Sequence, residues 1–335
     1  MQAMHLGAKL RDMEFVQWHP TRLDEPVPMF LTNGLLADGA IFRDASGRPF
    51  MADYDKRADL APRDILAKAI YTEARAGRGL GTAVYLDCSP IPEGRIALRH
   101  GHLAGTLRKH GVDFPRQWLV VSPATHFLMG GIAIDTNARS SIHGLYAVGE
   151  SAGGLHGANR LGGNAFSEGL VFGTIAGQHA ARALSLDGHT KLASAVADTV
   201  RAEIDPTADD PKAALSTMWH TLREEMWQDA SVVRDAAALA RAAQLIGELT
   251  EEGTRLRGRS PREVARILDF RAGLQCAAVI VASATYREES RGAHWRSDFP
   301  ETSEAWFGSV WVTWPSCQQH PTLQFKHLTS RPPSL

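Results

Sequence analysis

Two patterns of hydrophobic and polar residues alternate along the chain, and each predicts its own kind of element. Short runs rich in Val, Phe, Tyr and Trp predict strands at Met13–Trp18 and Ala83–Asp87. From about residue 191 onward, Ala, Leu and Arg recur at helical spacing. This spacing predicts three helices, at Thr217–Gln228, Ala230–Glu252 and Pro261–Thr285. The chain is therefore expected to be a mixed α/β protein with a helical C-terminal domain.

Turn and helix-start residues predict the elements of the N-terminal third. Residues 28–53 are expected to form a β-hairpin-like unit whose turn is Asp44–Gly47. A helix is expected over Asp59–Ile70, with Pro62 in its first turn, where the missing N–H of proline costs nothing. The amphipathic stretch Arg95–Gly111 predicts a second helix.

Three further expectations concern strand ends and the tail. Pro20 is expected to stop the first strand, because proline cannot donate a ladder hydrogen bond. Trp118–Asp135 predicts two strands around a polar turn, together with the pair Gly130-Gly131. The residues after Asp298 are rich in Trp, Pro and Ser and show no clear period, so an irregular tail is expected.

The stretch Gly144–Ala183 carries the strongest signal for a functional site. A short apolar run, LYAV, leads into a glycine-rich loop that holds Arg160, and a long helix is expected from Asn164. A strand, a glycine loop and a helix start in this order are typical of anion or cofactor sites. Glycines at a spacing of four in this helix are expected to let a strand or cofactor approach closely, since each otherwise costs about 1 kcal/mol.

Composition and charge then narrow the kinds of partner. A chain of 335 residues is long enough for two domains, or for one large α/β domain with an insertion. The formal net charge of −1 provides no polyanion-binding face, so nucleic acid is not expected as a partner.

The cysteines and the apolar runs bear on metals and location. The three cysteines are far apart and form no CxxC pair, which argues against a structural zinc or cluster site. The longest apolar run, Gly273–Ala284, is shorter than the ~20 residues of a membrane span, and no signal peptide opens the chain. A cytoplasmic location is expected, with any membrane association through partners and without a direct span.

Five charged or proton-bearing residues are candidates for chemistry: His19, Arg63, His126, Glu150 and Arg160. Arg63 is notable because a cation in the first turn of a helix opposes the helix dipole. Two arginines and two histidines that converged would bind a small dianion, since guanidinium groups hold carboxylates in bidentate fashion. Glu150 could accept hydrogen bonds from a ribose or cap a turn. A purely structural role remains open for each residue taken alone.

Several segments together resemble one family of flavoproteins. They occur in the family's order: Met13–Thr21 (MEFVQWHPT), Asp59–Ile65 (DLAPRDI), Ser122–Ile132 (SPATHFLMGGI), Gly144–Asn164 (GLYAVGE…LHGANRLGGN) and Glu289–Glu301 (ESRGAHWRSDFPE). The chain is similar to the flavoprotein subunit of succinate dehydrogenase and fumarate reductase, whose family also includes L-aspartate oxidase. The similarity covers roughly residues 5–300.

The resemblance implies a substrate site and a reaction. His19, Thr32, His126 and Arg160 match positions that hold the two carboxylates of a C4 dicarboxylate substrate. Arg63 matches the arginine that exchanges a proton with one substrate carbon while hydride passes between the other carbon and flavin N5. Such an arginine needs cationic or desolvated surroundings to act, because its ordinary pKa exceeds about 12.

The resemblance also implies FAD as cofactor. Glu150 matches the residue that binds the ribose of the flavin nucleotide, and Asn164, Ala165 and Phe166 match the helix start that faces the flavin ring. An iron–sulfur subunit or a second copy of the chain is the implied macromolecular partner.

The implied domain organisation divides the chain into four parts. Residues 1–21 and 121–190 would form the remaining part of an incomplete FAD-binding domain, and residues 22–120 an inserted substrate-capping domain. Residues 191–300 would form the helical C-terminal domain, and residues 301–335 the irregular tail. The family's GxGxxG unit is not in this sequence, so a fragment or truncated product with weakened FAD affinity and exposed apolar surface is expected.

The sequence also departs from the family in its proton path. The family has glutamate and arginine where this chain has Asn33 and Leu36, and neither of these side chains can carry a proton at neutral pH. An enzyme like L-aspartate oxidase, or a remnant without flavin or activity, therefore remains as an alternative to a fumarate reductase or succinate dehydrogenase type enzyme.

Overall fold

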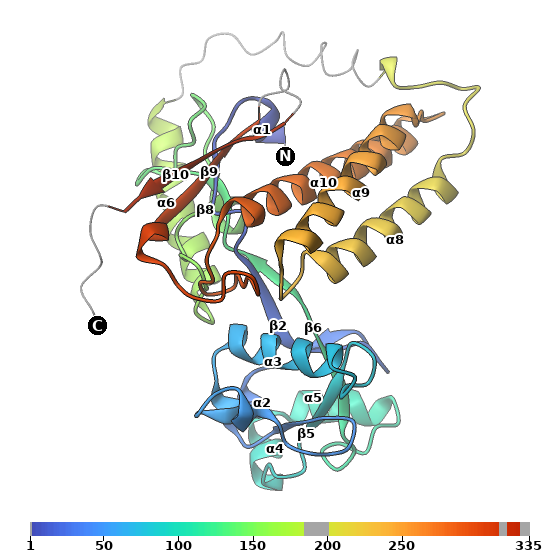
Figure 1. Cartoon of the computed structure of the whole chain (residues 1–335), viewed down its shortest axis with the longest axis vertical. Helices are drawn as coiled ribbons and strands as arrows, with labels where there is room; N and C mark the ends of the chain where they lie inside the picture. Colours follow the sequence, from blue (N-terminus) through green and yellow to red (C-terminus); the bar gives the residue numbers. More distant parts are fainter. Residues whose placement is uncertain (1, 184–200, 315–319, 329–335) are drawn as a thin grey trace. The chain divides into compact units, whose positions relative to one another are not determined.

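The chain forms two compact units in a computed structural model that describes residues 2–183, 201–314 and 320–328. Unit 1 comprises Met1–Phe15 and Leu128–Leu335, and unit 2 comprises Val16–Phe127 (Figure 1). The mixed α/β class with a helical C-terminal region is confirmed. The four-part domain division stays a prediction, and its boundary at residue 190 lies outside the described residues.

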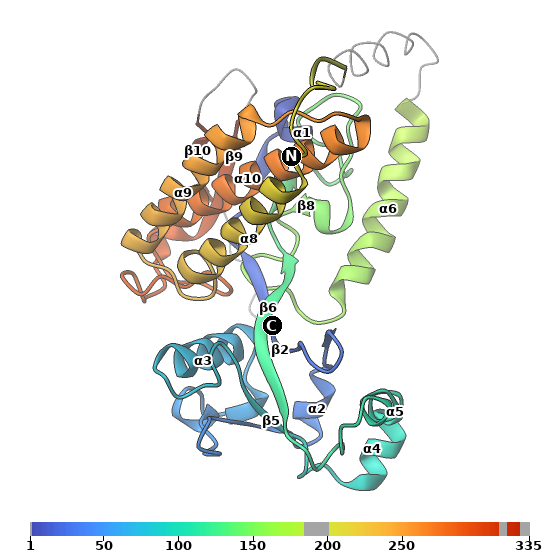
Figure 2. The same ribbon diagram turned by 90° about the vertical axis from the view of Figure 1, so that its right-hand side faces the viewer.

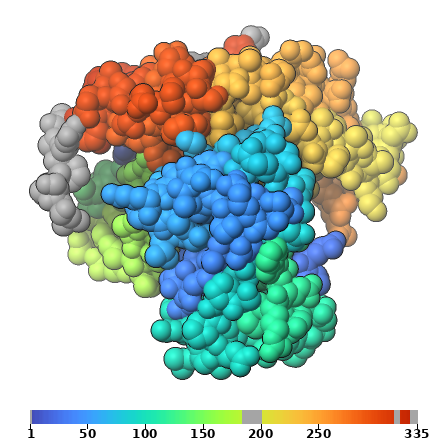
Figure 3. Space-filling model, turned by 60° about the horizontal axis from the view of Figure 1, so that its bottom comes forward, coloured from blue at the N-terminus to red at the C-terminus, as the bar shows by residue number. Residues whose placement is uncertain are grey.

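Unit 2 is built on a five-stranded sheet in the order β3-β2-β6-β5-β4. The strands are β2 (Val16–Leu23), β3 (Met29–Phe30), β4 (Ile41–Arg43), β5 (Val84–Asp87) and β6 (Leu119–Leu128). The helices of the unit are α2 (Gly34–Ala37), α3 (Arg63–Arg75), α4 (Glu93–Arg99) and α5 (Gly101–Lys109). In the space-filling view the residues of unit 2, coloured blue to green, form one continuous surface (Figure 3).

The strand β2 lies between β3 and β6 in the sheet of unit 2. Helix α3 packs on β2, and seven of the eight residues of β2 are buried. Pro20 lies inside β2, so the expectation that it ends the strand was wrong. The edge strand β3 pairs only with Arg22 and Leu23, so it requires no hydrogen bond from position 20.

Two other expectations for unit 2 were also wrong. Residues 28–53 as a whole do not form a hairpin, because α2 intervenes and buries Leu35 and Leu36, and β4 pairs with β5. The expected turn at Asp44–Gly47 is present, with a hydrogen bond from Gly47 N–H to the carbonyl oxygen of Asp44. The helix expected over residues 95–111 is broken at His100, whose backbone is not helical and whose imidazole Nε2 lies 2.8 Å from Asp38 Oδ2.

Unit 1 contains a second five-stranded sheet, in the order β10-β9-β1-β7-β8. Its strands are β1 (Leu10–Arg11), β7 (Gly131–Ala133), β8 (Ala152–Gly153), β9 (Gly308–Thr313) and β10 (Thr322–His327). The tail is therefore not irregular, since β9 and β10 pair antiparallel and β9 also pairs with β1.

The glycine pair Gly130-Gly131 enables strands from distant parts of the chain to approach closely. A Cβ on Gly130 would clash with the backbone of Asp12 and Met13, and one on Gly131 would lie 2.6 Å from the carbonyl oxygen of Ser151. The two strands expected over Trp118–Asp135 are present as β6 and β7, and this glycine pair separates them. The expected polar turn was wrong, because β6 continues unbroken through those residues.

The helices of unit 1 confirm the helical pattern. They are α1 (Gln2–His5), α6 (Asn164–Ala183), α8 (Lys212–Asp229), α9 (Ala236–Arg255) and α10 (Pro261–Tyr286). The last three pack together around buried side chains such as Leu239, Phe270 and Leu274. Helix α10 is long and apolar enough to cross a membrane. However, 44% of its apolar stretch is buried in the structure, and a helix in a protein core can have the same length and composition.

Glu14 belongs to unit 1, two residues before unit 2 begins in the sequence, and lies in a cluster of fully buried charged side chains. Its Oε1 accepts a hydrogen bond from Arg287 Nε at 2.6 Å, and both side chains are 0% exposed. Arg287 also donates to Glu289, while Arg234 Nη1 donates to the backbone oxygen of Glu14 and lies 2.9 Å from His294 Nδ1. These contacts fix the last residues before β2.

Burial shifts the pKa values of two members of this cluster. It raises the pKa of Glu14 to about 7, although Arg287 opposes the shift, and it lowers the pKa of His294 well below 6.5, with Arg234 adding to the effect. Between pH 4.5 and 7 the folded state binds more protons at Glu14 than the unfolded chain, so proton binding at Glu14 lowers the free energy of unfolding as pH rises. Below pH 6.5 His294 has the opposite effect, because the unfolded chain binds the proton.

Replacement of Glu14 should reveal the effect of His294 on the pH dependence of the free energy of unfolding. In Glu14→Gln the free energy of unfolding should rise with pH more steeply than in the wild type between about pH 5 and 6.5, by up to about 1.4 kcal/mol per pH unit. Urea unfolding over this pH range measures the slope. Glu251→Gln, at an exposed position of α9, should keep the wild-type slope. An unchanged slope in Glu14→Gln would show that Glu14 does not bind a proton on folding.

Candidate functional site

Three rings on adjacent strands of unit 2 form a mutually contacting cluster. The ring centroids of His19 on β2 and His126 on β6 are 4.9 Å apart. The ring of Phe30 on β3 lies 5.2 Å from His19 and 5.3 Å from His126. The structure thus brings together the two histidines that the sequence predicts to hold a carboxylate, and adds an aromatic ring that sequence reasoning missed.

The hydrogen bonds of His19 determine which ring nitrogen carries the proton of the neutral imidazole. The buried His19 accepts a hydrogen bond at Nδ1 from the backbone N–H of Thr21, at 3.3 Å. In turn, Thr21 Oγ1 donates to the carbonyl oxygen of Leu31 at 3.0 Å. Because Nδ1 is an acceptor here, neutral His19 carries its proton on Nε2 and can donate it to a carboxylate.

Thr32 lies just before the short helix α2. Its Oγ1 accepts a hydrogen bond from the backbone N–H of Gly34 at 3.1 Å, and its side chain is exposed. Neighbouring Asn33 has a buried Oδ1 with no hydrogen-bond partner among the described residues, and Leu36 is buried in the apolar core. Neither Asn33 nor Leu36 therefore provides an ionisable side chain next to Thr32.

Arg63 is the first residue of α3, directly after Pro62, and is half-buried. The same helix packs on β2, the strand that carries His19. A structural reason for a cation at this helix start is weak, because the helix dipole disfavours it there. Further along α3, burial lowers the pKa of Lys68 to about 8, against the attraction of Asp64.

The predicted site residues of unit 1 lie on the glycine-rich loop and its flanks. Arg160 is 6% exposed, and burial lowers its pKa against the attraction of Glu150 and Glu168. Glu150 lies in a short 3-10 turn, and its Oε1 accepts the backbone N–H of Leu128 at 3.0 Å. The expected strand before this loop is absent, since residues 145–148 form only one bridge, between Arg139 and Tyr146.

A buried histidine–glutamate pair supports this loop and was not predicted. His156 Nε2 lies 2.6 Å from Glu168 Oε2, and both side chains are largely buried. The pair joins the loop to the first turns of α6. A histidine in a glycine-rich loop followed by a glutamate in the next helix was the available signal, but its spacing of twelve residues has no recognised meaning.

The loop is also held by a distant segment of unit 1. The backbone N–H of Ala293 donates to the carbonyl oxygen of Ala158 at 2.9 Å. The adjacent Gly292 has φ +54°, and a Cβ there would lie 2.5 Å from that carbonyl oxygen. This contact places the ESRGAH segment against the residues just before Arg160.

Helix α6 presents an open apolar surface at its start. It packs on the Gly149–Ser151 turn, and both ribbon views show it apart from α8, α9 and α10 (Figures 1 and 2). Phe166 is 84% exposed, and Leu161, Leu170 and Val171 are exposed nearby. A Cβ on Gly169, Gly173 or Gly177 would meet nothing within 4 Å, so no described strand makes the close approach expected there.

The residues expected to bind FAD are compatible with such a group. The second carboxylate oxygen of Glu150 accepts no hydrogen bond from the described residues, so it can accept one from a ribose hydroxyl. The exposed apolar start of α6, at Asn164, Ala165 and Phe166, offers backbone N–H groups and an apolar surface to a flat ring. Their roles stay predictions.

The predicted residues thus divide between the two units. Unit 2 holds His19, Thr32, Arg63 and His126, whereas unit 1 holds Glu150, Arg160 and the start of α6. Within unit 2 the two histidines are in contact. Their assembly with Arg160 into one site stays a prediction.

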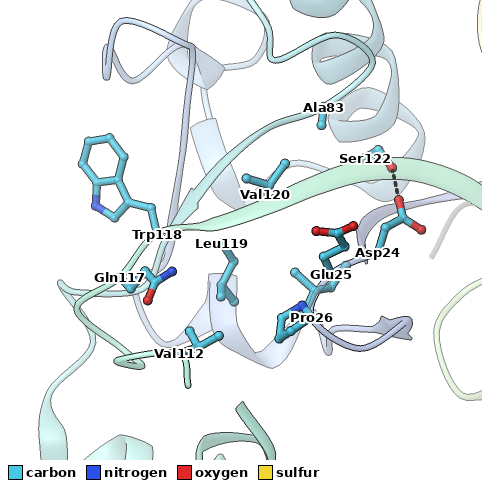
Figure 4. Close-up of a pocket in the computed structure, with 11 residues that line it drawn as sticks. Asp24, Glu25, Pro26, Ala83, Val112, Gln117, Trp118, Leu119, Val120 and Ser122 are labelled. Carbon is cyan, nitrogen blue, oxygen red and sulfur yellow. Dashed lines mark hydrogen bonds between the residues drawn. The ribbon is translucent and has the colours of Figure 1, made fainter. Parts of the chain in front are cut away.

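A separate hollow of about 370 Å³ opens in unit 2 (Figure 4). Asp24, Glu25, Trp118 and Val120 are among the residues that line it, and Ser122 Oγ donates to Asp24 Oδ2 at 3.4 Å. None of the predicted site residues lines this hollow, so its volume gives no support to the proposed chemistry.

Comparison with known proteins identifies two families in the chain. The FAD binding domain family matches residues 1–166, and the family described as Fumarate reductase flavoprotein C-term matches residues 219–333. One of the subunits of the CoM/CoB fumarate reductase of Methanothermobacter marburgensis is 35% identical over 316 residues, which cover 92% of this chain and 58% of that protein.

The L-aspartate oxidase of Caulobacter vibrioides is 40% identical over 302 residues, which cover 88% of this chain and 52% of that enzyme. Among solved structures, a variant of E. coli quinol fumarate reductase FrdA superposes with a TM-score of 0.87 at 29% identity, covering 99% of this chain and 62% of that one. The chain therefore spans little more than half the length of these proteins.

The contact between Gly292 and Ala158 predicts a specific structural effect. Gly292→Ala should destabilise unit 1 by about 1–3 kcal/mol, because φ +54° disfavours alanine and its Cβ would clash with the Ala158 carbonyl. Amide hydrogen exchange should accelerate at residues 154–163.

Gly247→Ala is the matched control. This glycine lies in α9, where a Cβ meets nothing, so alanine should stabilise the protein by about 0.5–1 kcal/mol and leave exchange in the loop unchanged. Wild-type exchange rates at residues 154–163 in Gly292→Ala would show that this contact does not hold the loop.

Proposed function

Because the chain belongs to the family of FAD-dependent flavoproteins that includes fumarate reductase and L-aspartate oxidase, we propose that it acts in the redox chemistry of a C4 dicarboxylate. The reaction is the interconversion of fumarate and succinate. The observation that carries the proposal is the contact between His19 and His126, at 4.9 Å between ring centroids. Two adjacent imidazoles supply donors for the oxygens of one carboxylate.

The substrate is bound through both of its carboxylates. His19 donates from Nε2, which its bond to Thr21 leaves as the protonated nitrogen, and His126 and the exposed hydroxyl of Thr32 add further donors. Arg160 supplies the permanent positive charge, and its burial strengthens a charge-assisted bond to an anion.

Arg63 donates the proton during reduction. Bound FAD would supply the hydride for one substrate carbon. In the same reduction, Arg63 gives a proton to the other carbon and is then reprotonated from water. The site must exclude bulk water and present other cations to make a guanidinium an effective acid. Asn33 and Leu36 offer no side-chain relay for that reprotonation, so water must reach Arg63 by another route.

The cofactor would be held by residues of unit 1. Glu150 accepts the ribose hydroxyls with its available oxygen, and the N–H groups at the start of α6 face the ring. The chain spans 52–62% of the relatives described above, and the contacts to FAD proposed here are those of unit 1 alone.

A second candidate function is the oxidation of L-aspartate. Its specific support is the 40% identity with the oxidase of Caulobacter vibrioides, the highest of the relatives described above. The same carboxylate-binding residues serve either acid. Two assays separate these activities. One measures fumarate reduction with a reduced dye as electron donor, and the other measures the peroxide formed from L-aspartate. Absence of both would leave a remnant without activity.

Partners and location follow from the kind of electron donor. An iron–sulfur subunit would deliver electrons for fumarate reduction, and a second copy of the chain is the alternative partner. The first would place the protein at a membrane through that partner, and the second in the cytoplasm.

Flavin binding is the first test of the proposal. The full-length gene product should purify yellow, because the available Glu150 oxygen and the exposed start of α6 are proposed to bind the flavin. Denaturation should release FAD, identified by its absorbance and by chromatography. A colourless full-length protein that releases no flavin would contradict the proposal and support the remnant.

Arg160 provides the second test. In flavin-loaded protein, Arg160→Ala should weaken dicarboxylate binding by at least about thirtyfold, since loss of one partner from a buried charged contact costs about 2–5 kcal/mol. The shift in the flavin spectrum on addition of fumarate measures this. Arg182→Ala, an exposed position in the last turn of α6, should bind like the wild type. An unaltered shift in Arg160→Ala would remove that residue from the site.

A further inference from the structure

Phe30 is a large apolar side chain that is only partly buried. It is 43% exposed, whereas its neighbour Leu31 is 1% exposed and belongs to the apolar core of unit 2, against which Met29 also packs. Successive side chains of a strand point to opposite faces, so Phe30 points away from the core that its two neighbours join. Its ring must therefore be stabilised by other contacts.

Those contacts are the two histidines of the proposed carboxylate site. The Phe30 ring lies 5.2 Å from His19 and 5.3 Å from His126, with interplanar angles of 58° and 63°. Tilted and edge arrangements at this distance are favourable for aromatic rings. The ring packs against both imidazoles, and its exposed part can contact a ligand of the histidines.

We propose that Phe30 is a specificity-determining residue, which makes the site favour an unsubstituted C4 dicarboxylate over a 2-amino dicarboxylate. This inference rests on the proposed function, because it takes His19 and His126 as the carboxylate donors. A ligand held by these histidines places its carbon chain near the Phe30 ring. Methylene groups gain from this contact, whereas an ammonium group would lose water without gaining a hydrogen-bond acceptor.

Succinate and L-aspartate are suitable probes, since they differ by one amino group. The histidine Cε1–H signals of the 335-residue chain, followed by NMR during titration with each acid, report binding at millimolar concentrations. The wild type should bind succinate at least about tenfold more tightly than L-aspartate. In Phe30→Ser, water can reach the amino group and the preference should fall about tenfold. In Phe30→Leu, which keeps an apolar side chain, most of the preference should remain.

The same spectra verify the contact itself. Removal of the ring in Phe30→Leu should shift the signals of both His19 and His126 before any acid is added, because the ring current is lost. Leu98→Ser provides the matched control, since Leu98 is an 81% exposed apolar residue on α4 outside the ring cluster. It should leave the histidine signals and the preference unchanged.

The outcomes separate this inference from the proposed function. Binding of succinate by the wild type with an unchanged preference in Phe30→Ser would overturn the role of Phe30 and leave the dicarboxylate site standing. A wild type that prefers L-aspartate would also overturn it, in favour of the amino acid oxidase. If neither acid perturbs the histidine signals, the proposed function fails and this inference fails with it.

Discussion

The buried ion pair between Glu14 and Arg287 is the constraint on which the arrangement of unit 1 depends. Both side chains are fully buried, and two charges removed from water are costly unless they are paired and hydrogen-bonded. Arg287 also donates hydrogen bonds to Glu289 and to the carbonyl oxygens of Trp306 and Gly308. These hydrogen bonds hold the chain from residue 287 to residue 308 against the N-terminal residues.

This charge cluster acts on the proposed site through the backbone. Glu289 is shared with Arg291, and the turn that follows places Ala293 N–H on the carbonyl oxygen of Ala158. Ala158 is two residues before Arg160. The position of the one buried arginine proposed to bind substrate thus depends on a network that contacts no substrate, since a displacement of the 289–294 turn would move the loop. In unit 2 the corresponding task is done by strand pairing, which places the rings of β2, β3 and β6 together.

Periodicity found the elements that are stabilised by local pattern and missed those that depend on distant partners. The helices α8, α9 and α10 repeat their apolar residues over many turns, so the sequence alone located them, and α6 was located from the glycine-rich loop before it. The strand β9 owes its place to Leu10, which pairs with Val312 some three hundred residues away, and no local pattern encodes such a partner. The helix α2 has only four residues, too few for a period, and forms because Leu35 and Leu36 reach the core.

The candidate site divides in the same manner. Residue types and family motifs predicted His19, His126 and Arg160, because chemistry restricts which side chains can bind a carboxylate. The ring of Phe30 lies against the histidines through tertiary packing, and its residue type gave no indication of this. Asn33 and Leu36 have the opposite character, since the sequence revealed that they cannot relay a proton and the structure supplies no ionisable replacement at either position. Carboxylate binding and proton supply are therefore separable properties of this fold. The first would need only fixed donors, which are proposed to lie on the strands of unit 2 and in the loop of unit 1. The second would need a continuous path of ionisable groups or water, and Asn33 and Leu36 in the α2 segment supply no ionisable side chain for it.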